Sequence, residues 1–186
     1  PLIVDSTLAT PFLLRPLEQG AAMVVHSASK FLAGQGSVLG GVLVDDGRFD
    51  AARSGHNFPH LVLPGPDGEP SVADRHGGNA RIAYARESVA PRFGPSPSPL
   101  NAFFIGQGVE TLGLRVERQS QNALAVARWL ATQDAVTRVD YAGLPTHPDH
   151  ALAVATLERG FGSIFTVTLA GGEDAARRVV EGVRVF

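Results

Sequence analysis

Three short apolar runs in the first 45 residues set the strongest limit on the fold. They occupy residues 2–4, 23–25 and 38–44, are rich in β-branched side chains, and are followed by polar turn residues. Runs of this length and composition indicate strands, and the first has the profile of a buried parallel strand. Because turns and helical patches separate the runs, the sequence predicts an α/β protein.

The middle of the chain carries weaker patterns. Residues 57–78 hold four prolines and four glycines, which predicts a long surface loop. Residues 81–89 are predicted to be helical. The Gly-Pro-Ser run at residues 94–99 should end that helix, because proline does not fit a helix interior and restricts the residue before it.

The last third of the chain alternates between helical and strand patterns. Apolar residues three and four apart predict one long helix that begins near Thr111, while Gly106, Gly108 and Gly113 weaken the start of the pattern. Strands at 136–141 and 164–169 and helices at 151–159 and 174–182 follow, and residues 183–186 alternate like a strand. This order predicts a first domain at residues 1–134 and a second that begins at residue 135.

Composition excludes several classes of function. The 186 residues carry 16 Lys+Arg against 18 Asp+Glu, so charge gives no reason to expect binding to nucleic acid or an anionic membrane. No cysteine is present, which excludes disulfides, thiolate metal sites and cysteine nucleophiles. No apolar run approaches the roughly 18 residues of a membrane span. The chain opens without methionine, directly in an apolar run, and is therefore expected to be an internal fragment.

A carboxylate and an amine follow two of the predicted strands. Asp5 ends the first run, and Lys30 comes after the polar turn that follows the second. Strands that end at the same edge of an open α/β sheet would bring both side chains to one crevice, where ligands bind in such folds. Asp5 is a candidate partner for a protonated pyridine nitrogen, although strand-end aspartates more often cap a turn.

Lys30 is the only lysine in the chain, and all other Lys+Arg positions are arginine. A Schiff-base role would require lysine, since only a primary amine condenses with an aldehyde. A composition generally poor in lysine explains the same observation equally well. Ser27 and Ser29 could bind a phosphate or could serve as ordinary turn hydroxyls. His26 is equally compatible with a role behind the lysine turn and with simple packing.

Taken together, these segments resemble the Cys/Met-metabolism family of enzymes that use pyridoxal phosphate. The resemblance covers nearly the whole chain and rests on residues 5–11, 26–34, 108–115, 121–123 and 141–148. Within the family, residues 34–41, 47–50 and 57–59 look most like the O-acetylhomoserine sulfhydrylase branch. Departures from the usual pattern occur at Ser6, Ser29 and Gln35, where asparagine, threonine and histidine are common.

The resemblance implies a fold and a site. The fold would be the C-terminal part of the large domain of a fold-type I, aspartate-aminotransferase-like enzyme, with the start of the smaller C-terminal domain. Lys30 would bind pyridoxal phosphate covalently and act as the catalytic base. Asp5 would pair with the ring nitrogen, Thr7 would lie against the ring, and Ser27 and Ser29 would bind the phosphate.

The resemblance also implies an activity. The protein would replace the γ-acetoxy group of O-acetylhomoserine by sulfide, giving homocysteine and acetate in methionine and cysteine metabolism. A cystathionine γ-synthase or a γ-lyase of the same family is the nearest alternative. The enzyme would be a cytoplasmic homo-oligomer, a dimer or tetramer with sites between subunits, that acts on a small amino acid. A piece this short is expected to be inactive alone, and a purely structural role is a further alternative.

Other patterns are weaker. The spacing of Gly34, Gly36 and Gly40 approaches a dinucleotide fingerprint, but its third glycine comes one residue late and no helix pattern follows. His147 and His150 have the spacing of metal ligands on a helix, yet Pro148 lies between them and no third ligand is near in the sequence. No metal site is therefore expected.

Overall fold

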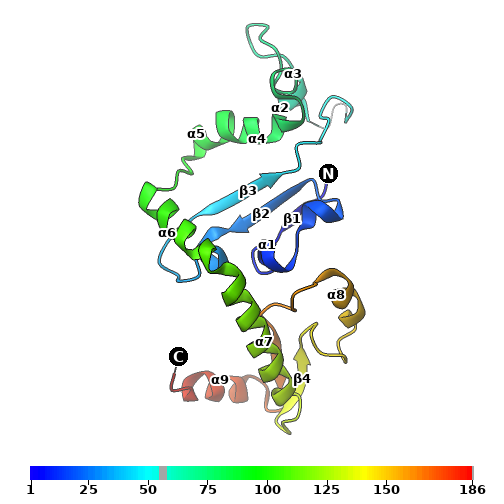
Figure 1. Cartoon of the computed structure of the whole chain (residues 1–186), viewed down its shortest axis with the longest axis vertical. Helices are drawn as coiled ribbons and strands as arrows, with labels where there is room; N and C mark the ends of the chain where they lie inside the picture. The colour runs from blue at the N-terminus through cyan, green and yellow to red at the C-terminus, as the bar shows by residue number, and fades with distance from the viewer. Residues whose placement is uncertain (55–57, 186) are drawn as a thin grey trace. The chain divides into compact units, whose positions relative to one another are not determined.

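The structure is a computed structural model that describes residues 1–54 and 58–185. It divides into two compact units. The first comprises Pro1–Thr10 and Arg15–Glu110, and the second comprises Pro11–Leu14 and the chain from Thr111 onward. The first unit holds a three-stranded sheet and the second a two-stranded sheet (Figure 1). The long helix α7 (Leu112–Leu130) thus belongs with the C-terminal strands, and the domain boundary expected at residues 134 and 135 stays a prediction.

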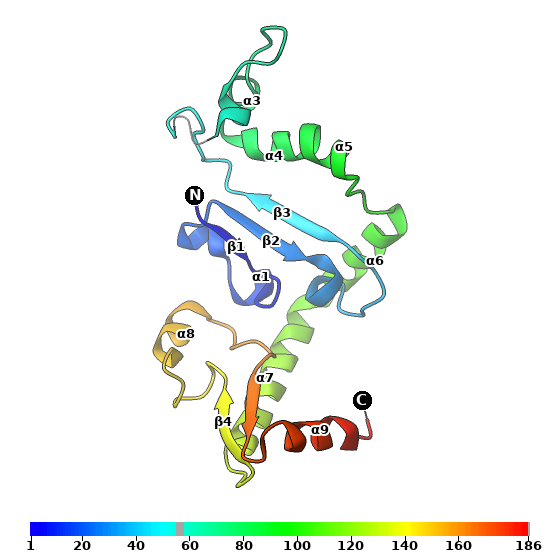
Figure 2. The ribbon, with the colours of Figure 1, turned by 180° about the vertical axis from the view of Figure 1, so that it is seen from behind.

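Two of the three strands predicted in the first 45 residues form at their predicted positions, in the sheet of the first unit. β1 (Ile3–Asp5) runs parallel to β2 (Met23–Ser27), and β3 (Gly41–Asp45) pairs with the other edge of β2 in antiparallel register (Figure 2). Between β1 and β2 the chain forms α1 (Thr10–Leu13) and the short 3-10 turn η1 (Pro16–Gln19). Gly20 ends η1 with a φ of 90°, a left-handed conformation that favours glycine.

Two expectations about these strands are wrong. β1 was expected to be buried, but Ile3 is 58% exposed, because β1 pairs only with β2 among the described strands. The third strand was expected from residue 38 and begins at Gly41 instead. Val38 is buried in the preceding loop, and the backbone of Gly40 accepts a hydrogen bond from the N–H of Ala28, so this segment follows the turn after β2 rather than the strand.

The prediction of a loop at residues 57–78 is also wrong for the part that the structure describes, residues 58–78. Residue 57 lies outside the described ranges. The described part contains helices α2 (Pro59–Val62) and α3 (Val72–His76), followed by the 3-10 turn η4 (Gly77–Asn79). Proline stands at the start of α2, where its missing N–H costs nothing. Ser71 and Asp74 form a capping box that starts α3, so residues typical of loops here begin helices.

A series of helical segments follows. α4 (Ala80–Tyr84), the π-helical turn η5 (Ala85–Val89) and α5 (Ala90–Phe93) confirm the helix predicted at residues 81–89. Gly94 ends this series with a left-handed φ of 71°, and the proline-rich residues after it separate it from α6 (Pro99–Glu110). α6 forms despite Gly106 and Gly108, which the sequence pattern treats as weakening.

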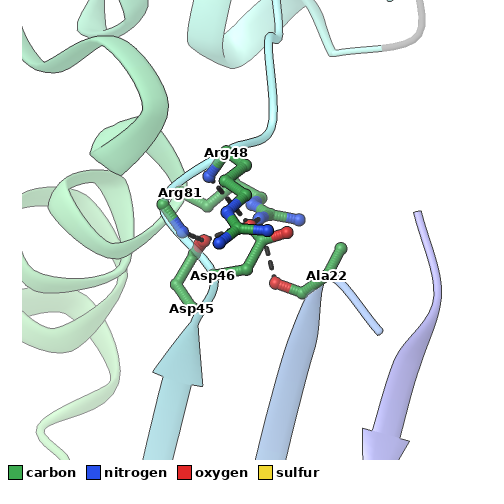
Figure 3. Close-up of polar contacts among 6 residues, drawn as sticks. Ala22, Asp45, Asp46, Arg48 and Arg81 are labelled. Atoms are coloured by element: carbon green, nitrogen blue, oxygen red, sulfur yellow. Dashed lines mark hydrogen bonds and ion pairs between the residues drawn. The ribbon is translucent and has the colours of Figure 1, made fainter. Parts of the chain in front are cut away.

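Arg81 ties α4 to the end of β3. Its Nη2 donates to Asp45 Oδ1 at 2.6 Å, to Asp46 Oδ1 at 3.0 Å and to the carbonyl oxygen of Ala22 at 3.0 Å (Figure 3). The guanidinium also lies 4.5 Å from the ring centroid of Phe49. The Arg81 side chain is only 10% exposed and that of Asp45 only 3%, so this is a buried, charged joint that fixes a helix to the sheet.

The second unit is built around α7 (Leu112–Leu130), which begins one residue after the expected start. β4 (Val136–Asp140) pairs in antiparallel register with β5 (Thr166–Leu169), and α8 (His150–Thr156) and α9 (Gly172–Gly182) complete the described elements. The core joins buried side chains of α7 to the segment after β4; its members are Ala123, Ala127, Tyr141 and Leu144. Residues 183–185 form no strand, and residue 186 lies outside the described range.

Candidate functional site

Lys30 lies in a kinked turn directly after β2. The turn is the π-helical segment η2 (Ala28–Leu32), and Lys30 breaks its geometry with φ −92° and ψ −114°. The N–H of Gly34 donates to the carbonyl oxygen of Lys30 at 2.7 Å, and that of Ala33 to Ala28 at 2.9 Å, so the turn is closed on both sides of the kink. Lys30 itself is exposed while Ala28 and Leu32 are buried. The backbone of the turn is therefore held in place on both sides of Lys30, and the Lys30 amine projects from it.

Asp5 is fixed at the end of β1 by its own turn and by β2. Asp5 lies opposite Val25 in the parallel register. Its Oδ1 accepts a hydrogen bond from the N–H of Thr7 at 2.9 Å, and the Oγ1 of Thr7 accepts one from the N–H of Ser27 at 2.8 Å. Thr7 is buried, so its hydroxyl connects the carboxylate turn to the strand that leads to the lysine.

The electrostatics of the turn keep the Asp5 carboxyl ionised. Hydrogen bonds from the side chain and then the backbone of Thr7 lower the pKa of Asp5 below its ordinary value. The charge of Lys30 lowers this pKa further, as does that of His26 when its ring is protonated. Lys30 and Asp5 thus lie close enough for their charges to interact. An ionised carboxylate here is suited to pair with a cationic ring nitrogen.

The two serines lie on either side of the start of the lysine turn. Ser29 Oγ accepts a hydrogen bond from the N–H of Gly40 at 3.0 Å and donates to the carbonyl oxygen of Gly40 at 3.3 Å. Ser27 is bonded through its backbone N–H to Thr7. Both serines are partly buried and both flank the carboxyl end of β2. The structure thus brings together all five residues that the sequence predicts, and their roles toward a cofactor stay a prediction.

Gly108 supports the lysine turn and was missed as a site residue. A Cβ atom at this position would lie 2.2 Å from the carbonyl oxygen of Ala33 and 2.5 Å from that of Leu32. Only glycine therefore allows α6 to approach the backbone of the turn so closely. Gly40 makes a similar approach, since its Cβ would lie 2.5 Å from Cδ1 of Ile105 in α6. The signal was a glycine inside a helical pattern, which often marks close packing.

The two C-terminal histidines serve the second unit. His147 Nε2 lies 2.9 Å from Asp140 Oδ1, and its Nδ1 accepts a hydrogen bond from the N–H of Asp149 at 3.1 Å. His150 Nδ1 lies 2.8 Å from the carbonyl oxygen of Ala142. Over residues 1–54 and 58–185, no group of three or more His, Cys, Asp and Glu side chains is arranged to hold a metal ion. A cavity of about 510 Å³ borders His147 and Asp140, but it includes none of the predicted site residues.

The residues at the end of β1 and β2 fit pyridoxal phosphate by their chemistry. Lys30 offers an exposed amine for an aldehyde, and Asp5 offers a carboxylate whose pKa the surrounding hydrogen bonds and charges lower. Ser27 and Ser29 carry hydroxyl groups at the start of the same turn, and in the structure the hydroxyl of Ser29 donates to the carbonyl oxygen of Gly40. No helix in the described part of the chain is both long and apolar enough to span a membrane.

Comparison with known proteins identifies the family. The family model for Cys/Met metabolism enzymes dependent on pyridoxal phosphate matches residues 1–186. The homocysteine synthase of Schizosaccharomyces pombe is 38% identical over 187 residues, which cover 100% of this chain and 44% of that protein. The chain thus spans less than half the length of this curated relative.

Solved structures agree in fold. A Campylobacter jejuni protein described as an O-acetylhomoserine (thiol)-lyase, which carries N'-pyridoxyl-lysine-5'-monophosphate, matches with a TM-score of 0.89 and 30% identity over 99% of this chain and 46% of its own. A cystathionine γ-synthase of Xanthomonas oryzae matches with a TM-score of 0.73 and 33% identity over 99% of this chain and 39% of its own. The α/β architecture is that of fold-type I enzymes, and the chain belongs to the Cys/Met metabolism family of enzymes dependent on pyridoxal phosphate.

Proposed function

We propose that the protein containing this chain converts O-acetylhomoserine and sulfide to homocysteine and acetate. The observation that carries the proposal is the placement of the Lys30 amine and the ionised Asp5 carboxylate at the ends of neighbouring strands. The substrate is inferred from relatives whose names include homocysteine synthase and O-acetylhomoserine (thiol)-lyase. The proposal includes a cytoplasmic location and a homo-oligomer with sites shared between subunits.

Each of the five site residues has a role in the proposed reaction. Lys30 would hold pyridoxal phosphate covalently through Nζ, and its amine would move the proton at the substrate Cα. Asp5 would hold the cofactor at its ring nitrogen, where an ionised carboxylate favours the protonated form. Thr7 orients Asp5 through the two hydrogen bonds that join it to Asp5 and Ser27. Ser27 and Ser29 bind the phosphate group.

The bond changes follow from these roles. Bound pyridoxal phosphate withdraws electrons from the substrate and makes its Cα and then its Cβ protons acidic. In this proposal, the amine of Lys30 is the base that moves the Cα proton. The Cγ–O bond to acetate then breaks, and a Cγ–S bond to sulfide forms. Hydrogen sulfide and O-acetylhomoserine thus give homocysteine and acetic acid, with no oxidant or reductant required.

Borohydride reduction tests the cofactor role directly. The intact protein is incubated with pyridoxal phosphate, reduced with borohydride, digested and analysed by mass spectrometry. A pyridoxyl group on Lys30 is expected, and Lys30→Ala should carry none. A reduced adduct on any other residue would refute the assignment of Lys30.

A second candidate function is cystathionine synthesis, favoured by the match to the Xanthomonas oryzae cystathionine γ-synthase. The two functions differ in the sulfur donor, since a cystathionine synthase uses cysteine in place of sulfide. The intact protein should therefore be assayed with O-acetylhomoserine plus sulfide, O-acetylhomoserine plus cysteine, and cystathionine or methionine alone. Faster turnover with sulfide supports the first proposal, faster turnover with cysteine supports the second, and turnover of cystathionine or methionine alone indicates a γ-lyase.

A further inference from the structure

Shortly after Asp5, the chain leaves the first unit for four residues. Pro11–Leu14 belong to the second unit, although the residues on both sides of them belong to the first. The chain crosses to the second unit between Thr10 and Pro11, at the start of α1. The segment that carries Asp5 and Thr7 therefore continues directly into a segment that packs with the second unit.

Leu13 fixes these four residues in the second unit. Its side chain is only 5% exposed. It lies beside two glycines, since a Cβ atom at Gly160 would lie 3.8 Å from Leu13 Cδ2 and one at Gly162 would lie 3.9 Å from Leu13 Cδ1. The hydroxyl of Tyr141 donates to the carbonyl oxygen of Gly162 at 2.7 Å and holds the backbone there. The buried leucine is thus packed against a part of the second unit that is itself held in place.

Phe12 adds two contacts with other parts of the same unit. The guanidinium of Arg159 lies 5.1 Å from the centroid of the Phe12 ring. A Cβ atom at Gly113, near the start of α7, would lie 3.3 Å from Phe12 Cε2, so the ring packs close to this helix. Phe12 and Leu13 together contact separate segments of the second unit, which fixes the position of α1 within that unit.

Thr10 joins α1 to the Asp5 turn through a strained backbone. Its φ is 60°, a left-handed value that a β-branched residue rarely adopts. Thr10 is 0% exposed, and its N–H donates to the carbonyl oxygen of Ser6 at 2.9 Å. Such strain persists only where the surrounding structure holds the backbone on both sides. The bond to Ser6 holds one side of Thr10, and the packing of Leu13 holds the other.

We propose that Leu13 is a positioning residue, which holds the Thr10 backbone from the second unit and so keeps the Asp5 carboxylate aimed at the ring nitrogen of the cofactor. The proposal rests on the proposed pairing of Asp5 with that nitrogen. Without the packing of Leu13, Thr10 relaxes to an ordinary negative φ, and its bond to Ser6, the neighbour of Asp5, is displaced. Leu13 therefore matters most for a cofactor that offers Asp5 a ring nitrogen.

The test compares Leu13→Ala with Leu13→Met in the intact protein. Leu13→Ala removes the packing, whereas Leu13→Met keeps an apolar side chain of similar volume. Affinity is measured by absorbance titration with pyridoxal phosphate and with its 1-deaza analogue, in which carbon replaces the ring nitrogen. We expect Leu13→Ala to weaken pyridoxal phosphate binding about tenfold or more, because a hydrogen bond to a charged group is lost. Leu13→Met should stay within about threefold of the wild type, and Leu13→Ala should bind the deaza analogue like the wild type.

The matched control is Leu144→Ala. Leu144 is also 5% exposed, and it lies in the core of the second unit that Ala123, Ala127 and Tyr141 form. Leu144→Ala removes the same atoms from the same unit, so urea unfolding should show a loss of stability similar to that of Leu13→Ala. Its affinity for both cofactors should equal that of the wild type. If Leu13→Ala does not fold, judged by circular dichroism, Leu13→Val and Leu144→Val replace the two alanine variants in the same comparison.

The outcomes separate this inference from the proposed function. The inference is overturned if Leu13→Ala binds pyridoxal phosphate like the wild type, weakens both cofactors equally, or weakens binding no more than Leu144→Ala does. Failure of Leu13→Met to keep the affinity would overturn it as well. If Asp5→Asn binds pyridoxal phosphate as tightly as the wild type, the proposed role of Asp5 fails instead. If the wild type does not bind pyridoxal phosphate, the proposed function itself fails.

Discussion

At the scale of single residues, Lys30 is set apart by its type and by its place. It is the only lysine, and it lies exposed at the kink of η2. Lys30→Arg keeps the positive charge but cannot form a covalent bond to the cofactor. We expect activity of the intact protein to fall roughly 10²–10⁴-fold or more, with the melting temperature of the cofactor-free protein nearly unchanged because the side chain is exposed. A variant that keeps more than a tenth of the activity would contradict the covalent role.

His26 gives a prediction about acid stability. Burial lowers the pKa of His26 below its ordinary value of 6.5, so the unfolded ring binds a proton at a pH where the folded ring does not. The contribution of His26 to stability is therefore complete above pH 6.5 and is lost as the pH falls below that value, by at most about 1.4 kcal/mol per pH unit. Urea unfolding at pH 7.5 and 5.5 measures the loss. His26→Gln should lose less stability over this range, and an equal loss in both proteins would contradict the prediction.

The sequence was informative at residues whose chemical type is rare. The only lysine and a strand-end aspartate stood out as candidates, and the family resemblance supplied their roles, which stay predictions. The connections between them were not predictable, since Thr7 binds Ser27 across 20 positions of sequence. Such contacts depend on strand register, which no pattern in a single sequence specifies.

At the scale of elements, the packing of α6 on the lysine turn depends on Gly108. Gly108→Ala would place a Cβ against two carbonyl oxygens of the turn, at 2.2 and 2.5 Å. We expect a loss of about 1–3 kcal/mol in the free energy of unfolding and weaker binding of pyridoxal phosphate, because the backbone has to shift. Urea unfolding and cofactor titration measure the two effects.

Gly106 in the same helix provides the control. A Cβ at Gly106 meets no atom within 4 Å. Gly106→Ala should therefore stabilise the protein by up to about 1 kcal/mol through helix propensity and leave cofactor binding unchanged. If both alanine variants behave alike, helix propensity rather than close packing decides the effect at Gly108.

The joint at Arg81 gives a second prediction at this scale. Arg81→Met would leave Asp45, whose side chain is 3% exposed, without its cationic partner. Breaking a buried pair in this way costs about 3–5 kcal/mol. Urea unfolding should show this loss, and Arg81→Met combined with Asp45→Leu should recover part of it. A loss below about 1 kcal/mol in the single variant would mean that water replaces the arginine at the carboxylate.

Elements were predictable where composition and periodicity agreed. The strands at β1, β2, β4 and β5 and the long helix α7 follow directly from such patterns. The short helices α2 and α3 were missed because proline and serine signal loops as well as helix starts, and only the reciprocal Ser71–Asp74 bonds decide between them. The exposure of β1 was missed because it depends on how many strands pair beside it.

At the scale of the whole molecule, the chain is much shorter than the relatives that it matches. It covers 44% of the Schizosaccharomyces pombe relative and 46% of the Campylobacter jejuni chain. We expect the 186 residues, expressed alone with pyridoxal phosphate, to show no robust turnover of O-acetylhomoserine and sulfide. The intact protein assayed in parallel is the control. Comparable rates from the two would show that these residues contain a complete active site.

The exposed kink at η2 also has a practical consequence. Within this chain, Lys30 is the only side chain that an amine-selective label can modify, and the label can reach it from solvent. The extent of labelling therefore reports the chemical status of one atom with no background from other lysines. An added aldehyde that binds Lys30 Nζ would protect this atom from the label. The mass of the labelled polypeptide would then report the fraction of Lys30 that carries the aldehyde.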